Sequence, residues 1–255
     1  MMSERMLVIA CRGDRECFPE NTMPAFEGAI SKGADGIEFD VHYTKDRELV
    51  VHHFLNLGYT DNGKGIVCEQ TLSTLESLDS GSWFDKQFFG ITKPTLSEVL
   101  ESYKGRTRFE IDLKDSGLEF LNRVIQEVER LDLVDDIELT TAHYPLLVHA
   151  KKINPRIRTG TFFYEPPDWM PLRIAQKQIL DWVELLRINV VHLNIVLITP
   201  DFVDRLHQGR FFVYGSNLDS REQIQKGIEL GVDSFSTGTL ELAIRLRDDH
   251  LSRVS

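Results

Sequence analysis

The sequence has no excess of positive charge and no long hydrophobic segment. Its 255 residues include 29 Lys and Arg against 40 Asp and Glu, which gives a formal net charge of −11. This balance argues against a nucleic-acid partner, because phosphate contacts need clustered basic side chains. The most apolar windows, at 188–198 and 211–214, are far too short to cross a bilayer, so we expect no membrane insertion.

Cysteine is also scarce. Three cysteines, an odd number in a chain of this length, do not indicate a disulfide framework. Residues 1–10 contain neither a long apolar run nor the cleavage-site pattern of a signal peptide. We therefore expect a soluble, cytoplasmic protein, and the sequence leaves its oligomeric state open.

Strand-like and helix-like segments alternate along the chain. Short runs of apolar and β-branched residues predict strands, and apolar residues at helical spacing predict helices. We expect strands at 7–10, 36–43, 48–53, 108–114, 137–141, 159–163, 190–193, 211–215 and 234–236. Helices are expected at 22–32, 95–103, 118–131, 145–153, 171–186, 200–207 and 220–230.

This alternation predicts an eight-fold α/β barrel, the (β/α)8 or TIM barrel. An open, doubly wound sheet is the alternative, but no Gly-x-Gly-x-x-Gly follows an expected strand. Because no linker or low-complexity tract marks a second domain, we expect one domain over 1–255. The polar stretch 55–95 has no clean period, and we interpret it as an insertion after the second strand region with little core of its own.

Two strands carry acidic residues at alternating positions. Glu38 and Asp40 lie two residues apart and project from the same face of their strand, and Glu110, Asp112 and Lys114 repeat the arrangement. Carboxylates that point into a barrel are costly unless a cation lies there, and such hard oxygen ligands suit Mg²⁺ or Ca²⁺. On spacing alone, a salt-bridged strand end explains the first pair equally well.

Several motifs resemble the opening of the glycerophosphodiester phosphodiesterase family. The resemblance is strong over 8–84, fair at 108–114 and weaker beyond. Its motifs are Arg12-Gly13, Pro19-Glu20-Asn21-Thr22, Ala25-Phe26, the stretch 33–41, Asn62-Gly63-Lys64-Gly65 and the stretch 78–84. The resemblance implies a TIM barrel that hydrolyses glycerophosphodiesters to an alcohol and glycerol phosphate with the help of a divalent cation.

The resemblance also implies roles for individual residues. In the family, two histidines move protons, and His53 matches the second of them. Arg12 and Lys114 would bind the phosphate. The metal ligands would be Glu38, Asp40 and Asp112, with Glu110 in reserve.

Four positions depart from the family pattern. Cys11 replaces the first histidine, Phe54 replaces an Asp, Tyr59 stands where Arg is usual, and Gly238 replaces the Asp of a closing Thr-Asp pair. All four are expected at or beyond strand ends on the catalytic side of the barrel. Three of them remove a charged group, so we expect a more apolar site and a repurposed or engineered chain.

Cys11 leads to our main functional prediction. A thiol does not transfer protons near neutral pH as imidazole does, but its thiolate is a strong nucleophile. We therefore predict that Cys11 and His53 form a nucleophile–base dyad that hydrolyses a small activated ester and needs no cofactor, with Arg12 near the oxyanion.

Further substrate contacts are expected, and other functions remain open. The residues concerned are Lys114, Phe54, Tyr59, His143 and Tyr214, of which His143 is also a second candidate base. One alternative is a metal-dependent glycerophosphodiesterase with reduced activity. Another is a catalytically lapsed barrel that binds a phosphorylated ligand or a partner, with Cys11 as a small buried apolar residue.

Overall fold

The computed structural model describes residues 5–254, and in it eight parallel strands close into a barrel. Pairing between β1 and β2 joins the two ends of the sheet, and β3 adds an antiparallel strand beside β2. The strands are β1 (Leu7–Cys11), β2 (Gly36–Tyr43), β3 (Leu49–Val51), β4 (Arg108–Leu113), β5 (Ile137–Thr140), β6 (Arg158–Phe163), β7 (Val190–Leu193), β8 (Phe212–Gly215) and β9 (Ser234–Thr237). The predicted (β/α)8 barrel is confirmed.

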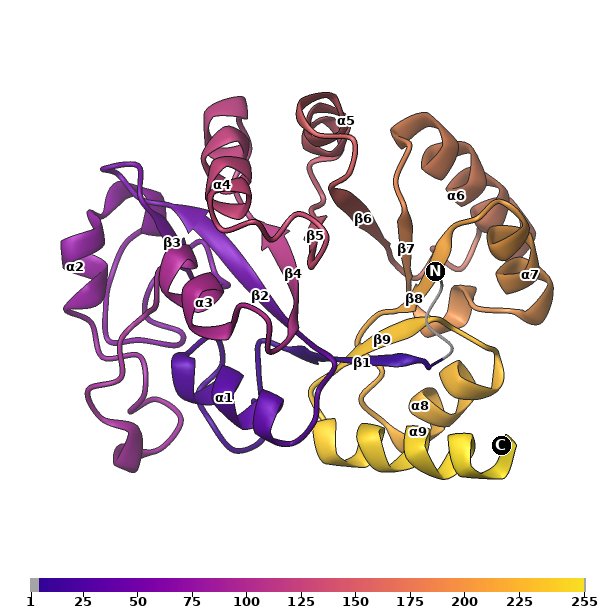
Figure 1. Cartoon of the computed structure of the whole chain (residues 1–255), viewed down its shortest axis with the longest axis horizontal. Coiled ribbons are helices and arrows are strands. Elements are labelled where there is room, and N and C mark those ends of the chain that lie inside the picture. Colours follow the sequence, from indigo (N-terminus) through magenta and orange to yellow (C-terminus); the bar gives the residue numbers. More distant parts are fainter. Residues whose placement is uncertain (1–4, 255) are drawn as a thin grey trace.

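Helices surround the strands, as Figure 1 shows. They are α1 (Met23–Ser31), α2 (Leu72–Glu76), α3 (Leu96–Tyr103), α4 (Leu118–Arg130), α5 (Tyr144–Ile153), α6 (Leu172–Leu186), α7 (Pro200–Gln208), α8 (Arg221–Glu229) and α9 (Leu240–Val254). We did not predict α9, which packs against α8 and β1. Within residues 5–254, no helix is both long enough and apolar enough to cross a membrane.

The two faces of β2 separate the core from the site. Ile37, Phe39 and Val41 are fully buried and belong to the main apolar cluster between strands and helices. The ring of Phe39 packs on Phe26 of α1, with 5.6 Å between ring centroids. Strand alternation therefore directs Glu38 and Asp40 toward the barrel interior.

The strand register gathers polar side chains in layers. Glu38 pairs with Cys11 on one side and with Glu110 on the other, and Asp40 pairs with Asp112. In a TIM barrel, inward-pointing residues at one level form a layer, and the layer nearest the carboxyl ends of the strands lies under the catalytic loops.

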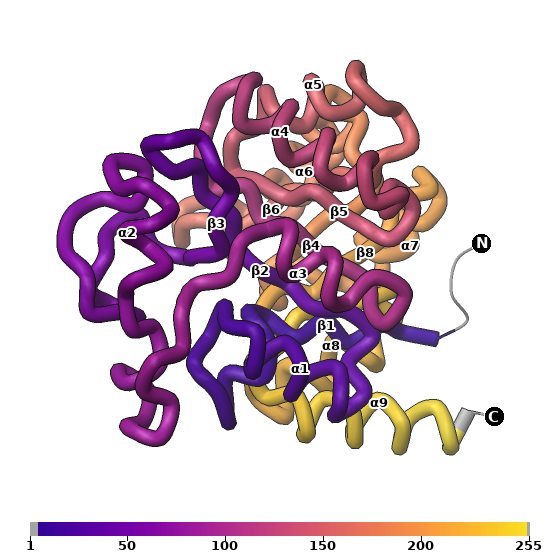
Figure 2. Tube along the Cα trace, turned by 60° about the vertical axis from the view of Figure 1, so that its left-hand side comes forward, coloured from indigo at the N-terminus to yellow at the C-terminus, as the bar shows by residue number. Residues whose placement is uncertain are grey.

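The segment between β3 and β4 contains short helices that we did not predict. These are α2 and the 3-10 helices η1 (Val67–Glu69) and η2 (Lys86–Phe88). Figure 2 shows α2 to one side of the barrel, beside β3. The main buried apolar residues here form a small cluster of Val50, Leu57, Val67 and Leu75, so little core belongs to the segment itself.

A buried ion pair lies next to this cluster. Lys93 Nζ is 2.8 Å from Asp61 Oδ2, and His52 Nε2 is 4.0 Å from the same oxygen. His52 is only 2 % exposed. Burial, reinforced by the Lys93 charge, lowers the pKa of His52 to about 4.

His52 should make the folded state sensitive to acid. Because an unfolded histidine titrates near pH 6.5, stability is full above about pH 6.5 and is lost as the pH falls toward about 4, where His52 charges in the folded state. The loss is on the order of 2–3 kcal/mol. We predict that His52→Gln gains stability relative to the unsubstituted chain across this window in thermal melts. A melting-temperature difference that stays constant from pH 7 to pH 4 would contradict the assignment.

Candidate active site

A pocket of about 890 Å³, including its open mouth, lies at the carboxyl ends of the strands. It is lined by Cys11, Arg12, Glu38, Asp40, His53, Glu110, Asp112, Lys114, Phe162, Phe163, Tyr164, Asn194, Ile195, Ser216, Asn217, Gln223 and Ser236. Ligand sites of TIM barrels occupy this end, because loops from several strands converge there. The pocket is therefore the candidate active site.

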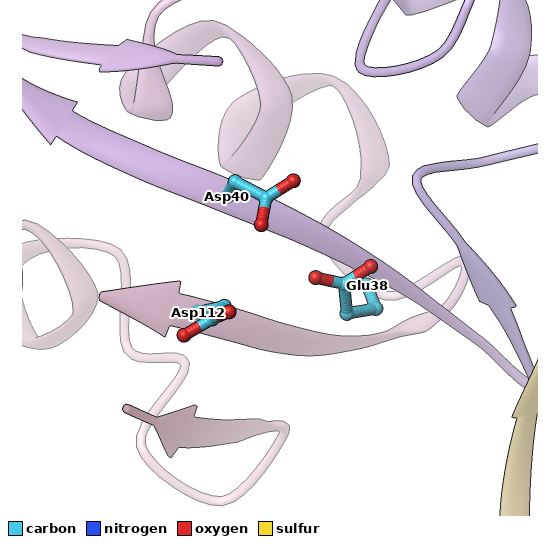
Figure 3. A group of neighbouring side chains, drawn as sticks. All are labelled: Glu38, Asp40 and Asp112. Carbon is cyan, nitrogen blue, oxygen red and sulfur yellow. The ribbon is translucent and has the colours of Figure 1, made fainter. Parts of the chain in front are cut away.

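Three carboxylates meet in the pocket (Figure 3). Glu38 and Asp40 extend from β2 and Asp112 from the neighbouring β4, and one oxygen from each lies within 4.8 Å of the others. All three residues are buried. Such a cluster of oxygen ligands suits a hard divalent cation such as Mg²⁺ or Ca²⁺.

Two basic side chains reach into the same cluster. Lys114 Nζ lies 2.7 Å from Asp40 Oδ1 and 2.5 Å from Asp112 Oδ2, and Arg12 Nε lies 3.3 Å from Asp40 Oδ2. The amide of Asn21 donates to Asp40 Oδ2 at 2.8 Å. Although burial alone raises it, Lys114 and Arg12 hold the pKa of Asp40 below its usual value.

The charges of the cluster leave room for a cation. Lys114 and Arg12 are the basic side chains paired with the cluster, and burial followed by the charge of Asp40 raises the pKa of Glu38 to about 8. A carboxyl group with a raised pKa favours its neutral form unless more positive charge is bound nearby. The residues present therefore fit a divalent cation.

Arg12 owes its position to a tight turn after β1. Its φ is +59°, and Gly13 follows with a φ of +82°. A Cβ atom on Gly13 would lie 2.6 Å from the backbone carbon of Ala25, so only glycine fits between the strand end and α1. Glu20 holds the guanidinium, with 3.1 Å between Nη1 and Oε1.

Cys11 and His53 line the same pocket, but their pKa values are poorly matched for transfer of the thiol proton to the imidazole. Burial, and then the charge of Glu38, raise the pKa of the Cys11 thiol well above its usual value, so the thiol is protonated at neutral pH. Burial lowers the pKa of His53 to about 4. The Nδ1 atom of His53 is buried and has no hydrogen-bond partner in the described chain.

Four of the residues that we expected to contact substrate do not line this pocket. Phe54 packs edge-on against His53 (4.5 Å between centroids), and Tyr59 packs on Phe54 (4.8 Å). His143 is exposed just before α5. Tyr214 lies deeper in the barrel, where its hydroxyl donates to Glu110 Oε2 at 2.6 Å. Glu110 lines the pocket but is not one of the three clustered carboxylates.

The site is less apolar around Gly238 than we expected. The side chain of Arg15 fills the space where residue 238 would carry a side chain, since a Cβ atom there would lie 2.0 Å from Arg15 Nε. Arg15 also pairs with Asp219, at 3.0 Å between Nη2 and Oδ2. The lack of a side chain at Gly238 thus leaves space for the guanidinium of Arg15. The family motif alone did not reveal this.

Sequence reasoning missed most of the far wall of the pocket. Its residues lie at or just after the ends of β6, β7, β8 and β9, and include Phe163, Asn194, Ser216, Asn217 and Ser236. The available signal was their position at or just after predicted strands, where loops of a barrel approach a ligand.

Comparison with known proteins identifies the family. Residues 12–241 match the Glycerophosphoryl diester phosphodiesterase family. The chain belongs to this family. A glycerophosphodiester phosphodiesterase of Caldanaerobacter subterraneus subsp. tengcongensis is 31% identical over 251 residues, covering 95% of this chain and 98% of its own. One from Bacillus altitudinis is 32% identical over 254 residues, with the same coverage.

Solved structures of the family share the fold. An Oleispira antarctica phosphodiesterase, solved in complex with the product sn-glycerol-3-phosphate, has a TM-score of 0.83 at 24% identity, covering 95% of this chain and 96% of its own. An Agrobacterium tumefaciens glycerophosphodiester phosphodiesterase has a TM-score of 0.80 at 24% identity, covering 94% and 99%. Family membership favours the phosphodiesterase alternative over the Cys–His esterase. An engineered origin stays a prediction.

The three carboxylates should give the fold a measurable response to metal. An ion that binds only the folded state stabilises it by about 2.7 kcal/mol at a hundred-fold excess over its dissociation constant. We predict that Mg²⁺ or Ca²⁺ raises the melting temperature of chelator-treated protein, and that Asp112→Asn removes most of this shift. Asp135→Asn, on an exposed carboxylate paired with Arg156, is the matched control. An equal shift in all three proteins would show that the ion binds elsewhere.

Proposed function

We propose that this protein is a metal-dependent phosphodiesterase that hydrolyses glycerophosphodiesters to an alcohol and glycerol phosphate. The observation that carries the proposal is the convergence of Glu38, Asp40 and Asp112 in a pocket that also holds Arg12, Lys114 and His53. The product-bound structure of the Oleispira antarctica relative supports the substrate class.

Each charged group has a role suited to phosphoryl transfer. Glu38, Asp40 and Asp112 would hold the divalent cation, which would supply positive charge to stabilise the phosphate in the transition state. Lys114 and Arg12 lie beside the same carboxylates, so their charges face the space where a phosphate would bind. Cationic side chains fixed in a partly buried pocket stabilise developing negative charge more strongly than in water.

His53 is the proton acceptor in this proposal. It is neutral at neutral pH, because burial lowers its pKa to about 4, and its buried Nδ1 has no hydrogen-bond partner among the described residues. An anionic phosphodiester in the pocket raises the pKa of a nearby imidazole. His53 can therefore accept a proton from the water molecule that attacks phosphorus, as the bond from phosphorus to the alcohol oxygen breaks.

Cys11 leaves the departing alcohol without a good proton donor. Its thiol stays protonated because burial raises its pKa well above the usual value, and a thiol is only a weak hydrogen-bond donor. Loss of a general acid removes a contribution of about 10²- to 10⁴-fold. We propose a slow enzyme that favours acidic leaving groups.

The cellular setting is a further part of the proposal. Cys11, Cys17 and Cys68 are all free thiols. Free thiols are typical of reducing compartments, which supports the cytoplasm as the place of action.

Cys11→Ala distinguishes the metal-dependent mechanism from the dyad, because only the dyad needs the thiolate. We predict that the unsubstituted protein hydrolyses glycerophosphocholine with Mg²⁺ or Ca²⁺ and stops in EDTA. His53→Ala should lose at least about 10²-fold in kcat, whereas Cys11→Ala keeps its activity because no thiolate takes part. Hydrolysis that survives EDTA and disappears in Cys11→Ala would restore the dyad and overturn the proposal.

The missing proton donor should appear as sensitivity to the leaving group. We predict that the ratio of kcat/KM for the glycerophospho-4-nitrophenyl ester to that for the glycerophosphoethyl ester is high, because only the nitrophenolate departs easily without a proton. Cys11→His should lower this ratio by about 10²-fold by speeding the ethyl ester. Cys17→His, at an exposed thiol outside the pocket, is the control. An unchanged ratio in Cys11→His would show that position 11 does not serve the leaving group.

A further inference from the structure

A second cavity lies directly beside the active-site pocket. It is formed by the end of β6, the loop into α6, α6 itself and the start of α5, with Tyr144, Met170, Ile179 and Trp182 among its walls. We call it the side groove. Tyr144 and Trp182 pack together there, with 5.3 Å between ring centroids.

The side groove adjoins the active site. Phe162, Phe163 and Tyr164, three consecutive residues at the end of β6, line both cavities. They form a shared wall, so a ligand that holds its phosphate beside Lys114 must pass over these aromatic side chains to reach the groove.

The surface around the side groove is unusually apolar. Tyr164 is 73% exposed, Trp169 is 77% exposed and Trp182 is 41% exposed. Leu172 and Ile174, on the first turn of α6, are also exposed. Large apolar side chains gathered on a surface mark a place where apolar matter binds.

The charge of the side groove restricts its occupant. Glu165 is the one Asp, Glu, Lys, Arg or His residue that lines it in the described chain, so an anionic head group finds no cation there. The net charge of −11 also disfavours an anionic membrane surface. An uncharged hydrocarbon chain fits both observations.

We propose that the side groove binds a long alkyl chain on the alcohol part of the substrate. Among esters of equally acidic alcohols, the preferred substrates are then single-chain amphiphilic phosphodiesters, in which glycerol phosphate is esterified to a long-chain alcohol. This inference rests on the proposed function, because the phosphate must lie between the carboxylate cluster and the groove.

A series of substrates of increasing chain length tests the groove. We expect kcat/KM for glycerophospho-n-alkyl esters, from methyl to dodecyl and below their micelle concentrations, to rise about two- to fourfold per methylene until the groove is filled. Because n-alkanols differ little in acidity, the series reports apolar contact and not leaving-group departure. A flat series with measurable turnover would overturn the inference and leave the proposed function intact.

Two variants separate the groove from the general surface. Met170→Asp places a charge in the groove wall and should reduce the dodecyl-to-methyl ratio at least tenfold. Leu185→Asp is the matched control, because Leu185 is 69% exposed on α6 and does not line the groove, and its ratio should not change. Equal ratios in the two variants would contradict the assignment, and circular dichroism establishes that both are folded.

A binding experiment decides the matter without turnover. Dodecyl phosphate should change the tryptophan emission of the unsubstituted protein at concentrations where ethyl phosphate does not, and Trp182→Phe should lose most of this change. If no ester is hydrolysed, the proposed function fails, and this titration by itself still tests whether the side groove binds an alkyl chain. Equal responses to the two phosphates would overturn the inference. Combined with a flat series, two further results would also overturn the inference. One is sedimentation of the protein with phosphatidylcholine vesicles, and the other is a dimer that dissociates in Met170→Asp.

Discussion

The arrangement of the site depends on the repulsion among buried carboxylates. Register between β1, β2 and β4 sets Glu38 beside Glu110 and Asp40 beside Asp112, and the closed barrel denies these groups the water that would screen them. Lys114 and Arg12 neutralise part of this negative charge. Burial, followed by the charge of Asp40, raises the pKa of Glu38 to about 8, and a bound cation would favour the ionised form of this carboxyl group.

The parts of the site that lie on strands were predictable from the sequence. Alternation along a strand has one geometric consequence, so Glu38, Asp40, Asp112 and Lys114 follow from their spacing once the barrel is recognised. The order of the strands followed equally from the repeated alternation of elements. The family motif added Arg12 and His53, which lie just after strands and whose directions spacing does not determine.

Contacts set by loops and by compensating changes were not predictable. Tyr214 lies on a strand as expected, yet its hydroxyl contacts Glu110 deep in the barrel. The depth of a side chain in the barrel depends on the exact position of its residue along the strand. The sequence pattern does not fix that position to within one residue pair. The short helices of the insertion lack the periodicity on which prediction relied, whereas α9 has buried Leu240, Ala243 and Leu246 at helical spacing and could have been predicted. The ionisation state of Cys11 depends on burial, which only the assembled structure provides.

Arg15 and Gly238 make two distant positions dependent on each other. The guanidinium of Arg15 occupies the volume that any side chain at 238 would need, and it remains there through its pair with Asp219. A larger residue at 238 is therefore tolerated only after Arg15 has been shortened or displaced. The effect of a substitution at either position on stability therefore depends on the residue at the other, and a side chain restored at 238 alone forces the guanidinium of Arg15 to move.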